Sequence, residues 1–229
     1  MSSPVLLAIE CSQRYGGVAL QDRSGQVHTV DLEPGIRRDD VLQPAIESLF
    51  DQASLGPSDL EGCGCSLGPG GFTGLRITIA TARAMGIALQ IPLYGIPSAA
   101  VAALSTPTPP GRVIVVLASK GESAWLTRIE HPREGRWIGP GELVAAKDLG
   151  PWLEGIVSII ADEHLPGSFQ RAAEAASIEI VEPCYNATCC LQMTSDRHKQ
   201  GLHDDPMAML PLYPRPPEAI SLWEAREGT

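Results

Sequence analysis

The chain has 229 residues, of which 44% are apolar and 19% are charged, as in an ordinary soluble globular protein. This length suits one large domain or two smaller lobes with a substantial core. The formal net charge is −10, from 17 Lys and Arg against 27 Asp and Glu. Strong nucleic-acid binding draws on a basic surface, so the charge argues against a protein that grips RNA by itself.

The compartment can also be predicted from composition. No apolar run approaches the roughly 18–20 residues that a membrane span needs. Val5–Ile9 follows the start without a basic segment or a cleavage site, which predicts a first strand rather than a signal peptide. Six cysteines are too few for a disulfide scaffold in a chain this long. We therefore expect a cytoplasmic protein without a membrane partner.

The first half of the chain predicts the element order βββαβαβα. Short apolar runs separated by turns predict three strands in an antiparallel meander, and later segments alternate between helical and strand patterns. The expected strands are Pro4–Glu10, Tyr15–Gln21, Gln26–Asp31, Leu60–Leu67 and Ile91–Ile96, and the expected helices are Asp40–Ala53, Thr73–Leu89 and Ser98–Leu104.

The second half predicts a shorter echo of the first. Ser105–Gly111 is rich in proline and is the clearest linker, so we expect one lobe over residues 1–104 and a smaller lobe with a proline-rich tail over 105–229. The expected elements are a hairpin of Arg112–Ala118 and Ser123–Glu130, a helix near Ala145–Leu153, strands Gly155–Ala161 and Ile178–Val181, and a helix from Asn186 to His198 or Lys199.

A glycine-rich loop connects an apolar strand to the long helix. A loop that feeds a helix N-terminus offers backbone N–H groups to an anion. The loop lacks the Gly-Lys-Ser/Thr ending of a phosphate loop, and no lysine lies near it. A tight turn without a ligand is therefore the stronger interpretation. The candidate contacts for an anion or nucleotide are Ser12, Gly68, Gly70, Gly71 and Thr73.

The helix after this loop is apolar on nearly every side. Ala80, Ala84 and Ala88 recur every four residues and form a smooth ridge, while Arg76 and Arg83 lie seven residues apart and so share one side. A helix that is apolar all round is normally buried, and arginine is enriched in protein interfaces. We expect this helix to lie half in the core and half in a subunit interface.

Two polar groups invite a metal or catalytic interpretation. Glu10 ends the first strand and could hold Mg²⁺ through water, although strand-end carboxylates usually hydrogen-bond a turn. Cys and His residues crowd together near the C-terminus, but their spacing fits a zinc site only partly, and buried free thiols are the better interpretation. The residues of this second group are Cys184, Cys189, Cys190, His198 and His203. We predict no catalytic residue and no metal site.

The stretch SLGPGGFTGLRITIATARAMGIALQIPLYGIPS, Ser66–Ser98, closely resembles the signature of the TsaB (YeaZ) family. The segments LLAIECSQRYGGVAL, VLQPAIESLF and PLYPR resemble the first hairpin, the first helix and the closing motif of that family. The resemblance is good over Val5–Ala102 and patchy afterwards. It implies an α/β, actin/Hsp70/sugar-kinase-like (ASKHA) fold of two lobes, with a degenerate second lobe.

The resemblance also implies a function. TsaB-like proteins are non-catalytic scaffolds that pair with a TsaD-like catalytic subunit and a TsaE-like ATPase in forming N6-threonylcarbamoyladenosine (t6A) at position 37 of tRNA. Catalytic subunits of this kind carry an H-x-x-x-H motif, which this chain lacks. The resemblance further implies a homodimer when the chain is alone, only indirect contact with tRNA, and no firm cofactor beyond ATP or ADP with Mg at the partner interface. By position, the interface residues are Val41, Leu42, Ala45, Phe72, Arg76, Ile79, Ala80 and Arg83.

Three polar positions depart from the family pattern. Glu10-Cys11-Ser12 stands where the family usually has aspartate-threonine-serine, and Arg38-Asp39-Asp40 stands where a histidine-serine pair is common. Leu117-Ala118-Ser119 replaces the usual Asp-Ala-Arg of the second lobe. These departures put residual nucleotide contacts in doubt, while the interface helix is kept.

Two alternatives remain open on the sequence. One is a stand-alone ATP-dependent enzyme of the same fold or a glycoprotease-like hydrolase, against which the missing Asp, Lys and metal-ligand motifs count. The other is a divergent homodimeric interaction protein outside the tRNA pathway.

Overall fold

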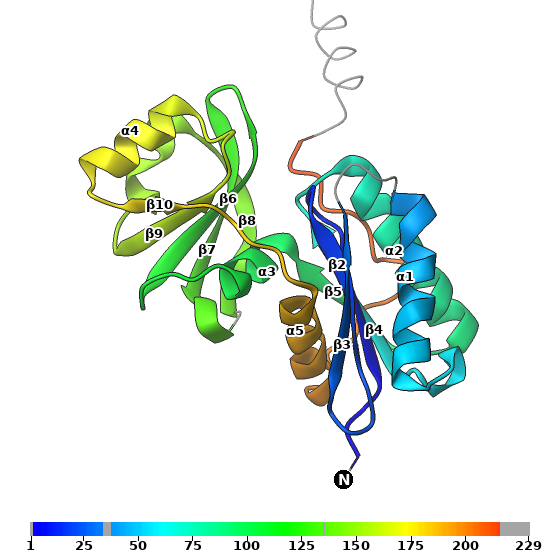
Figure 1. Ribbon diagram of the computed structural model, residues 1–229. Coiled ribbons are helices and arrows are strands. Elements are labelled where there is room, and N and C mark those ends of the chain that lie inside the picture. Colours follow the sequence, from blue (N-terminus) through cyan, green and yellow to red (C-terminus); the bar gives the residue numbers. More distant parts are fainter. Residues whose placement is uncertain (1, 34–37, 135, 216–229) are drawn as a thin grey trace, which may run out of the picture.

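The computed structural model describes residues 2–33, 38–134 and 136–215 and contains two five-stranded sheets (Figure 1). Their strand orders are β3-β2-β1-β4-β5 and β10-β9-β6-β7-β8. In both sheets antiparallel and parallel pairs are mixed, and helices pack on the faces. No helix in these ranges is both long and apolar enough to cross a membrane.

The first half of the chain has the expected order βββαβαβα, which is confirmed. β1 pairs antiparallel with β2 and parallel with β4, so the opening meander and the later strands join in one sheet. The strands are β1 (Leu6–Glu10), β2 (Gly16–Gln21), β3 (Val27–Leu32), β4 (Gly62–Gly68) and β5 (Leu93–Pro97). The helices are α1 (Arg38–Ala53), α2 (Phe72–Leu89) and α3 (Ser98–Ser105), with a short 3-10 turn at Pro57–Asp59.

Alternating side chains of β1 belong to two separate cores, since successive residues of a strand point to opposite faces. Leu7 and Ile9 pack with α1 and α2 on one face of the first sheet. Leu6 and Ala8 pack with α3 and α5 (Ala187–Lys199) on the other. Both faces are covered, which explains why the strand reads as a continuous apolar run rather than an alternating one.

The second half adds a third strand and a helix that the sequence did not predict. Its strands are β6 (Arg112–Lys120), β7 (Ser123–His131), β8 (Arg136–Ala145), β9 (Ile156–Ala161) and β10 (Glu179–Val181), and its own helix is α4 (Gly167–Ala175). Short 3-10 turns lie at Pro132–Glu134, Ala146–Asp148 and Gly150–Trp152. The α/β class predicted from the sequence is confirmed.

The prediction of a helix near Ala145–Leu153 is wrong. This segment follows the end of β8 and consists of two 3-10 turns. The sequence did not predict β8 because Gly139, Pro140 and Gly141 interrupt its strand pattern. Its pairing with β7 also shifts register twice. The sequence analysis also missed α4, which is a short helix of 9 residues whose buried side chains are Phe169 and Ala173.

The last helix returns to the first sheet, although it lies in the range expected for the second lobe. Asn186 caps α5, as predicted, by accepting a hydrogen bond from the Thr188 N–H at 2.8 Å. Cys190 and Leu191 then pack on the face of the first sheet that lies opposite α1 and α2 (Figure 1). The physical reason is that this face is apolar and needs a second layer to exclude water.

Helix α3 lies between the two sheets. Ala100 and Val101 belong to the core of the first sheet, while Ala99, Ala102 and Ala103 belong to the core beside β6. Because nearly all its side chains are small, both sheets can approach the same short helix closely.

Candidate interaction surface on helix α2

The glycine loop is packed against the turn that follows β1. A Cβ atom added at Gly70 would overlap the carbonyl oxygen of Ser12, and one added at Gly74 would overlap that of Cys11. The Gly71 N–H donates a hydrogen bond to the Ser12 carbonyl at 2.7 Å. The glycines are therefore needed for a close approach of two backbone segments, which leaves the start of α2 fixed on the first sheet.

The residues of this loop do not fit a phosphate group. The backbone N–H of Gly71, at the N-cap of α2, is already used by Ser12, whose side chain is buried. Gln13 covers the loop by donating from Nε2 to the Pro69 carbonyl at 3.2 Å. Among the predicted anion contacts, Ser12, Gly68, Gly70, Gly71 and Thr73, only Gly71 and Thr73 are exposed. This geometry favours the tight-turn interpretation, and we assign no nucleotide step to the loop.

Glu10 at the end of β1 is fully buried. Its Oε1 accepts a hydrogen bond from the Ser12 N–H at 2.7 Å, so the carboxyl group holds a turn. Burial raises the pKa of Glu10, and the hydrogen bond from the Ser12 N–H opposes this rise only in part. A buried carboxyl with a raised pKa favours the neutral acid, which is a poor ligand for a cation.

Helix α2 has one buried side and one exposed side. Ile79 and Ala82 pack in the core with α1 and the first sheet, and Leu75 is also buried. The opposite side is exposed although it is mostly apolar, and Phe72 and Ile87 are 55% and 58% exposed. The remaining exposed residues on this side are Thr73, Arg76, Ala80, Ala84 and Ala88. We call this side the α2 face.

The structure divides the predicted interface residues into three groups by exposure. Leu42, Ala45 and Ile79 are buried in the core of the first lobe, and of these three only Ile79 also lines a groove at the surface. Val41 and Arg83 are partly buried, while Phe72, Arg76 and Ala80 are exposed. The exposed side of α1 is polar, with Gln43 donating to Glu47 and Gln52 donating to Ser48. The apolar surface therefore belongs to α2 rather than to α1.

The chain's own C-terminal segment, Met207–Arg215, lies along the α2 face, and the sequence did not predict this. Tyr213 stacks on Phe72 with ring centroids 5.5 Å apart, and its hydroxyl accepts a hydrogen bond from Arg76 Nε at 3.0 Å. The Arg76 guanidinium also lies 3.7 Å from the centroid of the Phe72 ring. Arg83 contacts the Met207 sulfur at 3.8 Å. The only sequence signal for this placement is the apolar content of Leu210–Tyr213 among prolines.

A groove of about 400 Å³ runs between α2 and this segment. Arg76, Ile79, Ala80 and Arg83 line one side, and Leu210, Pro211 and Tyr213 line the other. We call it the α2 groove. It brings four of the predicted interface residues together.

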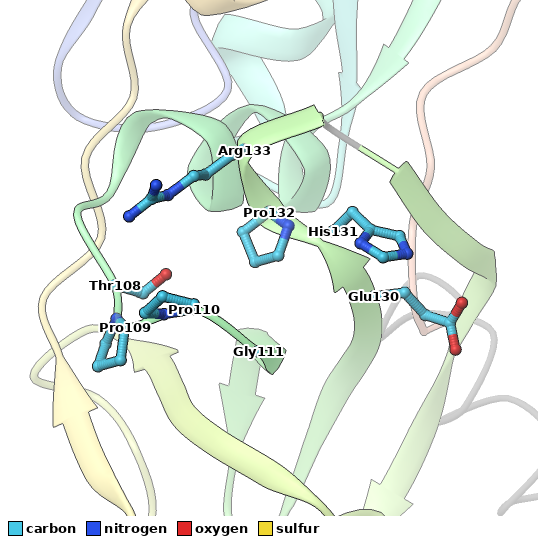
Figure 2. A pocket seen from close by; sticks show the side chains of 8 residues that line it. All are labelled: Thr108, Pro109, Pro110, Gly111, Glu130, His131, Pro132 and Arg133. Atoms are coloured by element: carbon cyan, nitrogen blue, oxygen red, sulfur yellow. The ribbon is translucent and has the colours of Figure 1, made fainter.

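A second cavity, of about 460 Å³, lies at the linker and contains none of the predicted site residues. Figure 2 shows the proline rings of the linker and of the turn after β7 around it, with Glu130 and Arg133 at its edges. Glu130 is paired with Arg112 at 3.7 Å on the surface. The cavity thus offers an apolar lining with few polar groups to orient a ligand.

The cysteines form no metal site in the described parts of the chain, where no three His, Cys, Asp or Glu side chains are placed to hold an ion. Cys63, Cys65 and Cys190 are buried, whereas Cys184 is exposed and Cys189 is partly so. Burial raises the pKa of the Cys63 thiol to about 12, which keeps it protonated and unreactive.

Comparison with known proteins gives similar sequences over most of the chain. The profile of the family described as TsaD: tRNA N6-adenosine threonylcarbamoyltransferase matches residues 38–133. The uncharacterized protein Rv3421c of Mycobacterium tuberculosis is 31% identical over 199 residues, 86% of this chain and 83% of that protein. The tRNA threonylcarbamoyladenosine biosynthesis protein TsaB of Buchnera aphidicola is 25% identical over 139 residues, 60% of this chain and 62% of that protein.

Among solved structures, YeaZ from Pseudomonas aeruginosa superposes with a TM-score of 0.73 at 19% identity, over 93% of this chain and 100% of that chain. This similarity confirms the predicted two-lobe fold. At this level of identity it concerns the fold alone.

Proposed function

Since the chain belongs to the TsaB (YeaZ) family of Gcp-like proteins, we propose that it is a non-catalytic scaffold subunit that binds a TsaD-like catalytic subunit through the α2 face. Family membership associates the chain with t6A biosynthesis. In our proposal it acts in the cytoplasm with a TsaE-like ATPase, contacts tRNA only indirectly, and forms a homodimer when the partner is absent.

The observation that carries this proposal is the apolar surface on one side of the molecule. Five of the eleven exposed large apolar side chains in the described ranges belong to α2 or to Met207–Arg215: Phe72, Ile87, Met207, Leu210 and Tyr213. Exposed apolar patches of this kind mark protein-binding surfaces, and stable interfaces bury about 1,600 Å² in total. The small side chains of Ala80, Ala84 and Ala88 allow another helix to approach α2 closely.

The test is co-purification with the TsaD-like subunit of the same organism. Ala80→Trp places a bulky group on the α2 face, and Arg76→Glu reverses a charge there, so we expect both variants to lose the partner while remaining folded. Ala175→Trp and Arg171→Glu are matched controls on exposed positions of α4, and they should bind normally. Unchanged association of both α2 variants would refute the proposal.

Two further measurements separate the alternatives. The wild-type chain should restore t6A, measured by nucleoside mass spectrometry, in a strain depleted of its own TsaB, whereas a paralogue outside the tRNA pathway would not. The isolated chain should hydrolyse no ATP above background. Turnover that survives purification to homogeneity would favour a self-sufficient enzyme instead.

A further inference from the structure

Within residues 2–33, 38–134 and 136–215, no carboxylate neutralises the positive charge of the α2 groove. The whole chain has a formal charge of −10, yet Arg76 and Arg83 lie on one side of α2. Within the described ranges these arginines contact two aromatic rings, a tyrosine hydroxyl and a methionine sulfur, and no carboxylate pairs with either. Each guanidinium therefore retains donors for an anionic partner.

Arg76 and Arg83 are separated by about two turns of α2. Seven residues on a helix span about 10 Å, with Ile79 and Ala80 forming the apolar floor between them. Leu210 and Pro211 line the opposite side of the groove, and Leu210 is 64% exposed. The groove thus presents an apolar centre with a cation near each end.

A small molecule fits this arrangement less well than a helix. The exposed apolar surface continues beyond the groove to Ile87 and Met207, over a length that a small ligand would not cover. Sites for small molecules also bury most of the ligand, usually with several convergent polar groups. A helix laid along α2 would cover the whole surface and place its side chains at the same repeat.

We infer that the α2 groove receives a helix of the catalytic partner that carries a large apolar side chain flanked by two carboxylates seven residues apart, with Leu210 and Pro211 forming one wall of the site. The carboxylates would meet Arg76 and Arg83, and the apolar side chain would sit over Ile79 and Ala80. This inference rests on the proposed function and adds the partner's chemistry and the contribution of the C-terminal segment.

The experiment measures the affinity for the purified TsaD-like subunit at about 50 mM and about 500 mM NaCl, where screening differs strongly. We expect the unaltered chain to lose about tenfold in affinity at the higher salt. Arg83→Gln should bind about threefold more weakly at low salt and should keep only about a threefold salt dependence, because Arg76 retains its carboxylate partner. Leu210→Asp should bind at least about tenfold more weakly at both salt concentrations.

Two matched controls lie outside the groove. Arg171→Gln on α4 and Leu202→Asp, at a leucine that is 50% exposed, should bind like the unaltered chain. A carboxylate-to-lysine substitution on the partner helix should restore binding to Arg83→Glu, and thermal unfolding should show that every variant is folded.

The outcomes separate this inference from the proposed function. If Ala80→Trp abolishes binding while Arg83→Gln and Leu210→Asp bind normally, the α2 face is the interface but our assignment of the groove is wrong. If the unaltered chain fails to bind the partner, both the proposed function and the groove assignment are overturned.

Discussion

At the scale of single residues, the end of β1 is a buried polar position in an apolar core. Glu10 is fully buried, and its Oε2 and the Ser12 hydroxyl have no hydrogen-bond partner in the described structure. Buried polar groups are costly unless they are hydrogen-bonded, and a charged one costs more. The carboxyl group is therefore most stable when it keeps its proton.

The stability of the protein should depend on this proton. Burial raises the pKa of Glu10 above its usual value of 4.5, so the folded state binds the proton more tightly than the unfolded state. The contribution of this proton to the free energy of unfolding is fully present below the pKa of Glu10 in the unfolded state. It is lost as the pH rises toward the pKa of Glu10 in the folded state, with a limiting slope of about 1.4 kcal/mol per pH unit for one proton. We expect Glu10→Gln to remove this slope and to be the more stable form at pH 8.

Urea unfolding between pH 4 and pH 9 checks this prediction. Glu154→Gln, at an exposed glutamate, is the control and should follow the unaltered protein. If the free energy of unfolding changes with pH in the same way for Glu10→Gln and the unaltered protein, the prediction is contradicted. Glu10 would then be ionised in the folded protein at these pH values.

The glycines of the loop give a second prediction at this scale. On helix propensity alone, Gly74→Ala would stabilise α2 by about 0.8–1 kcal/mol. Because the added Cβ would overlap the Cys11 carbonyl oxygen, we expect a destabilisation of about 1–3 kcal/mol instead. Gly150→Ala is the control, since an added Cβ there meets nothing within 4 Å. Chemical denaturation measures both, and a stabilised Gly74→Ala would refute the packing argument.

At the scale of elements, the C-terminal segment connects the two sheets. The Leu212 N–H donates to the Leu67 carbonyl at the end of β4 at 2.7 Å, and Met209 is buried in the first core. Arg215 then reaches the β6–β7 hairpin, where it donates to the carbonyls of Ala118 and Ser123 and to the Ser123 hydroxyl. Figure 1 shows this segment passing α2 and rising between the two sheets.

We expect Arg215→Ala to loosen the hairpin. The three hydrogen bonds are partly exposed, so the loss in unfolding free energy should be about 1 kcal/mol. Amide hydrogen exchange should accelerate at residues 117–124 and stay unchanged in β9. Arg215→Lys should recover only part of the protection, because an ammonium group cannot make the forked contacts of a guanidinium. Equal exchange in Arg215→Ala and in the control Arg171→Ala would show that this contact does not hold the hairpin.

At the scale of the whole molecule, the chain crosses to the second sheet and comes back. Residues 1–104 form the first sheet with α1, α2 and α3, but α5 covers the face that carries Leu6, Ala8 and Ala19. After α5, Asp204 connects the chain to β5 by accepting a hydrogen bond from the Gly95 N–H at 2.7 Å. Asp204 also forms a salt bridge with Arg197 at 3.0 Å. We propose that the first folding unit comprises residues 1–104 together with 186–215.

This proposal predicts how fragments of the chain behave. Residues 1–104 alone should aggregate or remain unfolded, because one face of the sheet lacks its cover. The same fragment joined to residues 186–215 by a flexible Gly/Ser linker should fold, with dispersed amide signals in its NMR spectrum. A fusion to a scrambled 186–215 segment is the control, and a folded 1–104 fragment would contradict the proposal.

Much of the first lobe is predictable from the sequence because its order depends on local patterns. Strand and helix periods, the glycine turn and the Asn186 cap each act within a few residues, and all of them are found in the structure. Of the missed elements, β8 is interrupted by glycine and proline, and α4 is a short helix of 9 residues with two buried side chains.

By itself, the sequence determined the element order of the first lobe, the family and the apolar character of α2. Only the tertiary structure decided which side of α2 is open, that Leu42, Ala45 and Ile79 are core residues, and that Met207–Arg215 forms a wall beside Arg76 and Arg83. The reason is that burial on a helix that is apolar all round depends on what packs against each side. For Arg83 the packing partner is Met207, which lies more than 120 residues later in the sequence. No local pattern specifies such a contact.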